Sequence, residues 1–65
     1  MNKQQFIKRC IKQLNLLVVN HSNGDIELMD RSGISNYHNY IHDSGTTSWS
    51  TRYQEAKFSV ELARK

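Results

Sequence analysis

The histidines are the residues of this sequence whose type and spacing most readily suggest chemistry. His38 and His42 are four positions apart, and His21 and Asp43 lie elsewhere in the chain. On a helix, two histidines at this spacing can chelate zinc, whereas on a strand they stand about 13 Å apart and cannot share an ion. Cys10, the only thiol, belongs to a separate apolar stripe. We therefore expect ordinary surface histidines and no metal site.

The possible nucleophiles have no partner at a spacing that indicates catalysis. Nucleophilic catalysis needs a nucleophile, a base and an orienting group within hydrogen-bond reach, and neither Cys10 nor the serines mark such an arrangement. The three glycines, Gly24, Gly33 and Gly45, are too far apart to form a phosphate-binding loop. A chain of 65 residues also has little core to spare for an enclosed active site. We expect a protein that is not an enzyme, with no cofactor and no small-molecule substrate.

Positive charge gathers at the two ends of the chain. The net charge of +3 divides into +4 over residues 1–14, −3 over residues 15–45 and +2 over the remainder. Lys8, Arg9 and Lys12 fall on one side of a predicted helix, and we expect Arg64 and Lys65 to lie nearby. Such a group of cations would neutralise phosphates or steer a charged partner. For nucleic acid, base stacking would come from Tyr37, Tyr40, Trp49 and Tyr53, together with Arg52. The alternative is that the cations bind no partner and simply form the solvated face of the helix.

A second candidate surface consists of Phe58 and Leu62. Both project from the side of the C-terminal helix opposite its main apolar stripe, which is formed by Trp49, Tyr53, Ala56, Val60 and Ala63. Large exposed apolar side chains often mark a contact with another protein. Packing of the N-terminal helix against Phe58 and Leu62 is the alternative, and it would make them part of the core.

The N-terminal segment predicts a helix over residues 3–14. Asn2 and Gln5 form a capping-box pattern. Ile7, Cys10, Ile11 and Leu14 recur at helical spacing, with Phe6 at the edge of the stripe. Asn15 suits the end of such a helix.

The next residues, 16–29, predict a β-hairpin. Leu16–Asn20 is rich in apolar and β-branched residues, which favours a strand. Asn23-Gly24 is typical of a type I′ turn. In the second strand, Ile26 and Leu28 alternate with polar or flexible neighbours, so we expect both side chains to point inward. Ile34–His42 is ambiguous between helix and strand, and we favour a third strand because a lone hairpin is marginally stable.

The last segment predicts a helix over residues 50–64, capped by Ser48 or Ser50. Together these elements predict a single domain over residues 1–65 of the α+β class. Its small antiparallel sheet, of two or three strands around Asn23-Gly24, is flanked by an N-terminal and a C-terminal helix in the order α-β-β-β-α. The helices are expected to cover one face of the sheet.

These observations favour a small stand-alone binding protein that adapts or inhibits a host macromolecule by protein–protein contact. Phe58 and Leu62 would anchor a protein partner or a second copy of the chain, and Lys8, Arg9 and Lys12 would steer it. The alternative is a nucleic-acid-binding regulator that uses the same cations. Short chains without disulfides are typical of phage and mobile-element accessory proteins. With one cysteine, no secretory signal and no membrane-spanning run, we expect a cytoplasmic protein without a membrane partner.

Overall fold

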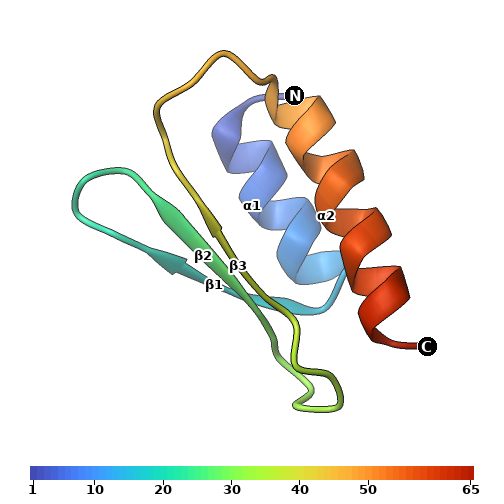
Figure 1. Ribbon diagram of the computed structural model, residues 1–65. Helices are drawn as coiled ribbons and strands as arrows, with labels where there is room; N and C mark the ends of the chain where they lie inside the picture. The colour runs from blue at the N-terminus through green and yellow to red at the C-terminus, as the bar shows by residue number, and fades with distance from the viewer.

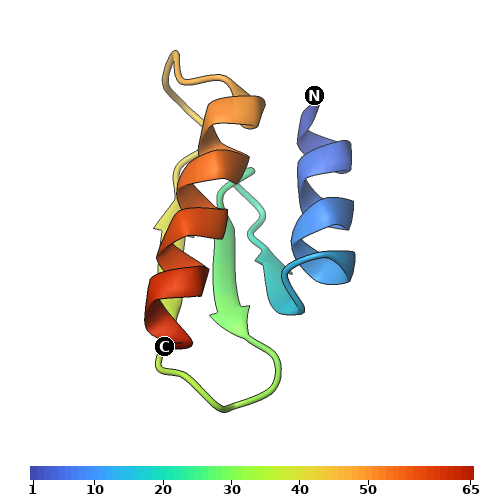
Figure 2. The ribbon, with the colours of Figure 1, turned by 90° about the vertical axis from the view of Figure 1, so that its right-hand side faces the viewer.

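The computed structural model describes all residues from 1 to 65 and has two helices and three strands. In chain order these are α1 (Lys3–Lys12), β1 (Leu16–Asn20), β2 (Ile26–Asp30), β3 (His38–Ile41) and α2 (Trp49–Ala63). The strands form one antiparallel sheet in the order β1-β2-β3. Both helices lie side by side over the same face of this sheet (Figure 1, Figure 2). The predicted α-β-β-β-α fold is confirmed.

Local side-chain interactions set the beginning and end of α1. The Asn2 side chain accepts a hydrogen bond from the Gln5 backbone N–H at 2.9 Å, and the Gln5 side chain accepts one from the Asn2 N–H at 2.9 Å. This reciprocal pair is the predicted capping box. The helix ends at Lys12, two residues earlier than predicted, and Asn15 then takes a positive φ of 53° that turns the chain into β1.

The hairpin forms at the predicted place, but its turn differs from the predicted one. Gly24 has a φ of +94°, whereas Asn23 does not have the positive φ that a type I′ turn requires. Instead, the Asn23 side chain accepts a hydrogen bond from the Asp25 N–H at 3.0 Å, and the Gly24 N–H donates to the His21 carbonyl at 3.0 Å. These local bonds satisfy the backbone through a different turn.

The ambiguous segment contributes the third strand. Residues 38–41 pair with β2, with Leu28 opposite Asn39, and the rest of the predicted segment, residues 34–37 and His42, lies outside the strand. Because β3 is not hydrogen-bonded to a further strand, its other edge is open.

The core lies between the sheet and the two helices. Its buried residues come from every element except β3, and Leu14 adds one from the link between α1 and β1. The full set is Phe6, Cys10, Leu14, Leu16, Ile26, Leu28, Tyr53, Ala56 and Val60. Ile26 and Leu28 point inward as predicted.

Phe6 occupies the centre of this core rather than the edge of the α1 stripe. Its side chain is 0% exposed, and its ring lies 5.1 Å from that of Trp49 and 6.5 Å from that of Tyr53. Ile11, which was predicted to be in the stripe, is 37% exposed. The centre of the buried stripe therefore lies nearer to Phe6 than predicted, because α2 packs against this side of α1. Periodicity alone does not specify this tertiary contact.

The second helix begins at the predicted cap. The Ser48 hydroxyl accepts a hydrogen bond from the Thr51 N–H at 3.1 Å. Tyr53 joins the two helices, since its hydroxyl donates to the Gln13 side chain at 2.7 Å. Neither α1 nor α2 combines the length and the apolar run needed to cross a bilayer.

Candidate functional site

Two surfaces of the molecule carry the residues of interest. The first is the outward side of the helix layer, here called the helix face and defined by Lys8, Arg9, Lys12, Phe58 and Leu62. The second is the side of the sheet that the helices leave uncovered, here called the sheet face. Figure 1 shows both helices on one side of the sheet, so the two surfaces lie on opposite sides of the protein.

Phe58 and Leu62 are exposed on the helix face. Phe58 is 64% exposed and Leu62 is 50% exposed, although both are large apolar residues. They lie one turn apart on α2, on the side away from the buried Tyr53, Ala56 and Val60. The alternative in which α1 packs against them is therefore wrong, because α1 contacts the Trp49 and Tyr53 side of α2 instead.

The three cations of α1 are also exposed. Lys8 and Lys12 lie opposite the buried Phe6 and Cys10, whereas the Arg9 guanidinium lies 5.9 Å from the ring of Tyr53. None of the three has a carboxylate within ion-pair distance. Their charge is therefore available to a partner.

The two C-terminal cations behave differently from each other. Arg64 pairs with Asp30 at 3.4 Å and also donates to the Asn15 carbonyl at 3.4 Å. Lys65, the last residue, is exposed and has no ion-pair partner. Arg64 thus ties the end of α2 to the sheet rather than adding a free charge to the α1 cations.

Most of the aromatic residues expected to stack on bases belong to the core instead. Tyr53 is buried, Tyr37 is half-buried, and Trp49 lies between Phe6 and the guanidinium of Arg52, which is 4.3 Å from its ring. Of the predicted stacking residues, Tyr40 alone is exposed as an aromatic ring, at 40%. The predicted stacking residues are therefore absent from the helix face, whose exposed aromatic ring is that of Phe58.

The sheet face carries all three histidines of the chain. Side chains of a strand alternate between the two faces, and the register places residues of equal parity side by side on the uncovered face. Two rows cross the paired strands: Leu17, Met29 and His38; Val19, Glu27 and Tyr40. Just beyond the strand ends, His21, Asp25 and His42 continue the same alternation. Apolar residues occupy one corner, and the other positions are titratable.

Glu27 on the central strand joins two of these histidines. Its carboxylate oxygens lie 2.6 Å from His21 Nε2 and 2.7 Å from His38 Nε2. These hydrogen bonds, first that of His38 and then that of His21, lower the pKa of Glu27 below its ordinary value. Glu27 is therefore held as a carboxylate between two imidazoles.

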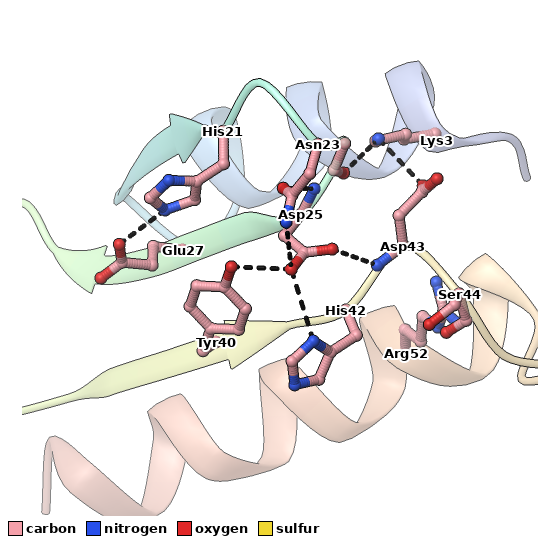
Figure 3. A network of polar contacts seen from close by, with 11 residues as sticks. Lys3, His21, Asn23, Asp25, Glu27, Tyr40, His42, Asp43, Ser44 and Arg52 are labelled. Atoms are coloured by element: carbon pink, nitrogen blue, oxygen red, sulfur yellow. Dashed lines mark hydrogen bonds and ion pairs between the residues drawn. The ribbon is translucent and has the colours of Figure 1, made fainter.

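Asp25 gathers the second cluster, as Figure 3 shows. It is only 8% exposed and accepts hydrogen bonds from the Asp43 N–H at 2.9 Å and the Tyr40 hydroxyl at 2.7 Å, while His42 Nδ1 lies 3.3 Å away. The bond from the Asp43 backbone, followed by that from Tyr40, lowers the pKa of Asp25 to about 2. The same bond to a carboxylate raises the pKa of Tyr40.

A third polar contact joins the helix layer to the loops at this end of the sheet. Lys3 Nζ donates to the Gly24 carbonyl at 2.5 Å and to Asp43 Oδ1 at 3.0 Å (Figure 3). One side chain of α1 thus holds both the hairpin turn and the loop between β3 and α2.

The spacing of His38 and His42 in the sequence suggests a pair and does not reveal their carboxylate partners. His38 begins β3 and His42 directly follows it. They contact different carboxylates, respectively Glu27 of β2 and Asp25, which directly precedes β2. The available signal was the alternation of the strands, which puts Glu27 on the face opposite Ile26 and Leu28. The pairing between strands, which brings the histidines to it, was not available.

No group of three or more histidine, cysteine, aspartate or glutamate side chains is arranged to hold a metal ion. The sheet face is instead suited to proton transfer, because imidazoles gain and lose protons near neutral pH and carboxylates orient them. Comparison of this chain with protein families, with curated proteins and with solved structures finds no match.

Proposed function

We propose that this protein binds another protein through the helix face, with Phe58 and Leu62 entering an apolar groove and the α1 cations meeting acidic residues around it. The observation that carries this proposal is the exposure of two large apolar side chains, 64% and 50%, one turn apart on a helix whose core-facing side is already occupied. Monomeric proteins seldom leave such pairs exposed without a use. Aromatic anchors seated in pockets contribute most to binding in many interfaces.

The charge of the helix face specifies the kind of partner. Lys8, Arg9 and Lys12 are exposed, have no carboxylate partner, and lie on a helix without an acidic residue. An acidic surface would be attracted to this face, and complementary charge raises the association rate more than it raises affinity. We therefore assign the anchoring to Phe58 and Leu62 and the steering to the cations.

The role requires no catalytic step. It agrees with the expectation of an adaptor or inhibitor that occupies a surface of a host macromolecule in the cytoplasm, as accessory proteins of phages and mobile elements do.

The test is a pair of matched double variants. Phe58→Ser with Leu62→Ser removes the exposed pair of α2, and Leu17→Ser with Ile34→Ser removes two other exposed apolar residues, which are 48% and 83% exposed, away from the helix face. Immobilised wild-type protein and each variant are exposed to the same host extract, and retained proteins are identified and their affinities measured. We expect a partner retained by the wild type and the control but bound at least 30-fold more weakly by the α2 variant, since a single anchor contributes about 2 kcal/mol or more.

Equal retention by both double variants would refute the assignment. Both should fold, because they alter exposed residues, and circular dichroism checks this. Unfolding of the α2 variant alone would show that Phe58 and Leu62 belong to the core. A second copy of the chain as the partner would appear as an apparent mass that rises with concentration and is lost in the α2 variant.

Nucleic acid is the second candidate partner, and the unpaired cations of α1 favour it. Changing Lys8, Arg9 and Lys12 to Gln should then abolish binding to labelled oligonucleotides. If binding persists, the slope of log affinity against log salt should fall by about 2 to 3, one neutralised phosphate per lost cation. Absence of binding at low salt for both single- and double-stranded probes would exclude this alternative. The full or partial burial of Tyr37, Trp49 and Tyr53 removes most of the predicted stacking residues and makes nucleic acid the weaker of the two candidates.

A further inference from the structure

The outer edge of β3 carries backbone groups that have no partner within the chain. The Asp30 N–H donates to the Tyr37 carbonyl at 3.3 Å, which continues the register of β2 and β3, so these residues are a hydrogen-bonded pair of the ladder. Such pairs alternate along antiparallel strands, so the N–H and C=O groups of His38 and Tyr40 point away from β2. A row of unpaired backbone groups at a sheet edge is a template for a further strand.

A groove lies beside this edge, between β3 and α2. Cα atoms of α1 and β1 approach within 8 Å, whereas no Cα atom of α2 lies within 8 Å of one in β3. The strand also adds no buried residue to the core. The resulting groove has a volume of about 270 Å³ and is lined by Asn39 and Ile41 of β3 and by Arg52 and Glu55 of α2, among others. The β3 side of the molecule is therefore open both along its backbone and beside it.

The groove contains one cation and one anion, and neither is paired within the chain. Arg52 and Glu55 lie one turn apart on α2, and neither has an ion-pair partner. The Arg52 guanidinium lies 4.3 Å from the ring of Trp49 and donates to the Ser44 carbonyl at 3.5 Å. These contacts hold the guanidinium in place and leave most of its five N–H donors free for a carboxylate. The charges of this groove are therefore complementary to those of an identical groove.

We propose that the chain forms a two-fold symmetric dimer through the outer edge of β3, in which Arg52 of each copy pairs with Glu55 of the other. A two-fold contact joins the same patch of both copies, so the patch must complement itself. Two β3 strands related by such an axis run antiparallel and join the two sheets into one.

The direction of α2 places the charges correctly for this symmetry. β3 runs towards the loop that precedes α2, and α2 runs back from that loop (Figure 1). Arg52 therefore lies towards the end of β3, and Glu55 lies towards its beginning. The axis brings the end of one β3 beside the beginning of the other, so each cation faces an anion.

The dimer should be weak, because β3 has only four residues and the contact is smaller than a standard interface. It uses a surface other than Phe58 and Leu62, so it does not depend on the binding proposed for the helix face. Both helix faces stay accessible in the dimer. A dimer would therefore present two copies of that binding surface to a partner, which raises the overall affinity for a partner with two sites.

Sedimentation equilibrium measures self-association of the wild-type protein and of two charge reversals. We expect the apparent mass of the wild type to rise from one chain towards two between about 10 µM and 1 mM. Arg52→Glu and Glu55→Arg should each weaken the dimer by about 10- to 30-fold, because attraction becomes repulsion at two places. An equal mixture of the two variants should associate again, since every pair in the mixed dimer joins opposite charges. A wild type that stays monomeric at about 1 mM, or a mixture that associates no better than the single variants, overturns the proposal.

Matched controls separate this edge from other surfaces. Lys57→Glu and Glu61→Arg make equivalent charge reversals at exposed positions of α2 that do not line the groove, and both should dimerise like the wild type. Phe58→Ser with Leu62→Ser should also dimerise, and loss of the dimer in this variant would place the contact on the helix face and overturn the proposal. Circular dichroism checks that every variant is folded.

Hydrogen exchange of the backbone amides tests the strand pairing itself. The amides of His38 and Tyr40 should exchange at least about tenfold more slowly at high protein concentration than at low concentration, because they become paired only in the dimer. The amides of Asn39 and Ile41, which face β2, should be protected at both concentrations. Self-association without slower exchange at His38 and Tyr40 overturns the proposal.

Discussion

Replacing Phe6 with leucine tests whether the core is centred where the two helices meet. Phe6 is 0% exposed and packs against two aromatic rings, those of Trp49 at 5.1 Å and Tyr53 at 6.5 Å. Each aromatic pair contributes about 0.5–1.5 kcal/mol beyond the burial of its area, so the loss of both should lower the free energy of unfolding by about 1–3 kcal/mol. Leucine is smaller than the ring it replaces, and the remaining void adds to this loss.

The size of the chain makes such a loss easy to detect. At about 0.05–0.15 kcal/mol per residue, the whole protein is stabilised by roughly 3–10 kcal/mol, so Phe6→Leu should fold but melt about 8–16 °C lower for a loss of about 2 kcal/mol. Thermal and urea unfolding followed by circular dichroism measure both quantities.

Phe58→Leu is the matched control for this experiment. The substitution is the same, but Phe58 is 64% exposed and should change stability by less than about 0.5 kcal/mol. Equal losses for the two variants, or a larger loss at Phe58, would refute both the position of the core and the exposure on which the proposed binding surface depends.

Three further predictions concern single groups. Tyr53→Phe, which removes the hydroxyl that donates to Gln13 at 2.7 Å, should lower the free energy of unfolding by about 1 kcal/mol, and a double-mutant cycle with Gln13→Ala should recover most of this as coupling. Burial raises the pKa of the Cys10 thiol to about 12 from 9.0, so an aromatic disulfide reagent should modify it about a thousandfold more slowly in the native protein than in urea, and similar rates would contradict its burial. Folding lowers the pKa values of Asp25 and Glu27, so their carboxylates stabilise the native state above the ordinary carboxyl range, and this stabilisation is lost as the pH falls. The melting temperature should therefore decline between about pH 4 and pH 2, and it should decline less in Asp25→Asn.

Local signals in the sequence were sufficient to predict the two helices and the hairpin, whereas the third strand was favoured only because a lone hairpin is marginally stable. The capping box of Asn2 and Gln5 and the turn at Asn23-Gly24 act within a few residues, so their effects can be read without tertiary structure. The rotation of α1 that brings Phe6 to the centre depends on α2, which lies more than forty positions away in the chain. Periodicity shows which side chains share an apolar stripe. It does not identify the helix that packs against the stripe, and that contact determines which residue lies at its centre.

The residues of the helix face could be predicted from the sequence more fully than the contacts on the sheet face. The exposure of Phe58 and Leu62 was one of two alternatives, because a helical projection shows which side chains oppose the main stripe. The contacts of Glu27 with His21 and His38 join three strand regions, and they require the register between strands. Spacing along the chain contains no information on such a cluster.

The hydrogen bonds of Lys3 have a consequence for the kinetics of folding. This one side chain joins residues 21 and 40 positions away, at Gly24 and Asp43. Contacts over such separations form late, after the helices and the hairpin have collapsed onto each other. Their loss would leave the folding rate nearly unchanged and would raise the unfolding rate. We therefore expect the contacts of Lys3 to slow unfolding, by the modest factor that a partly exposed ion pair allows, and to have little influence on the folding rate.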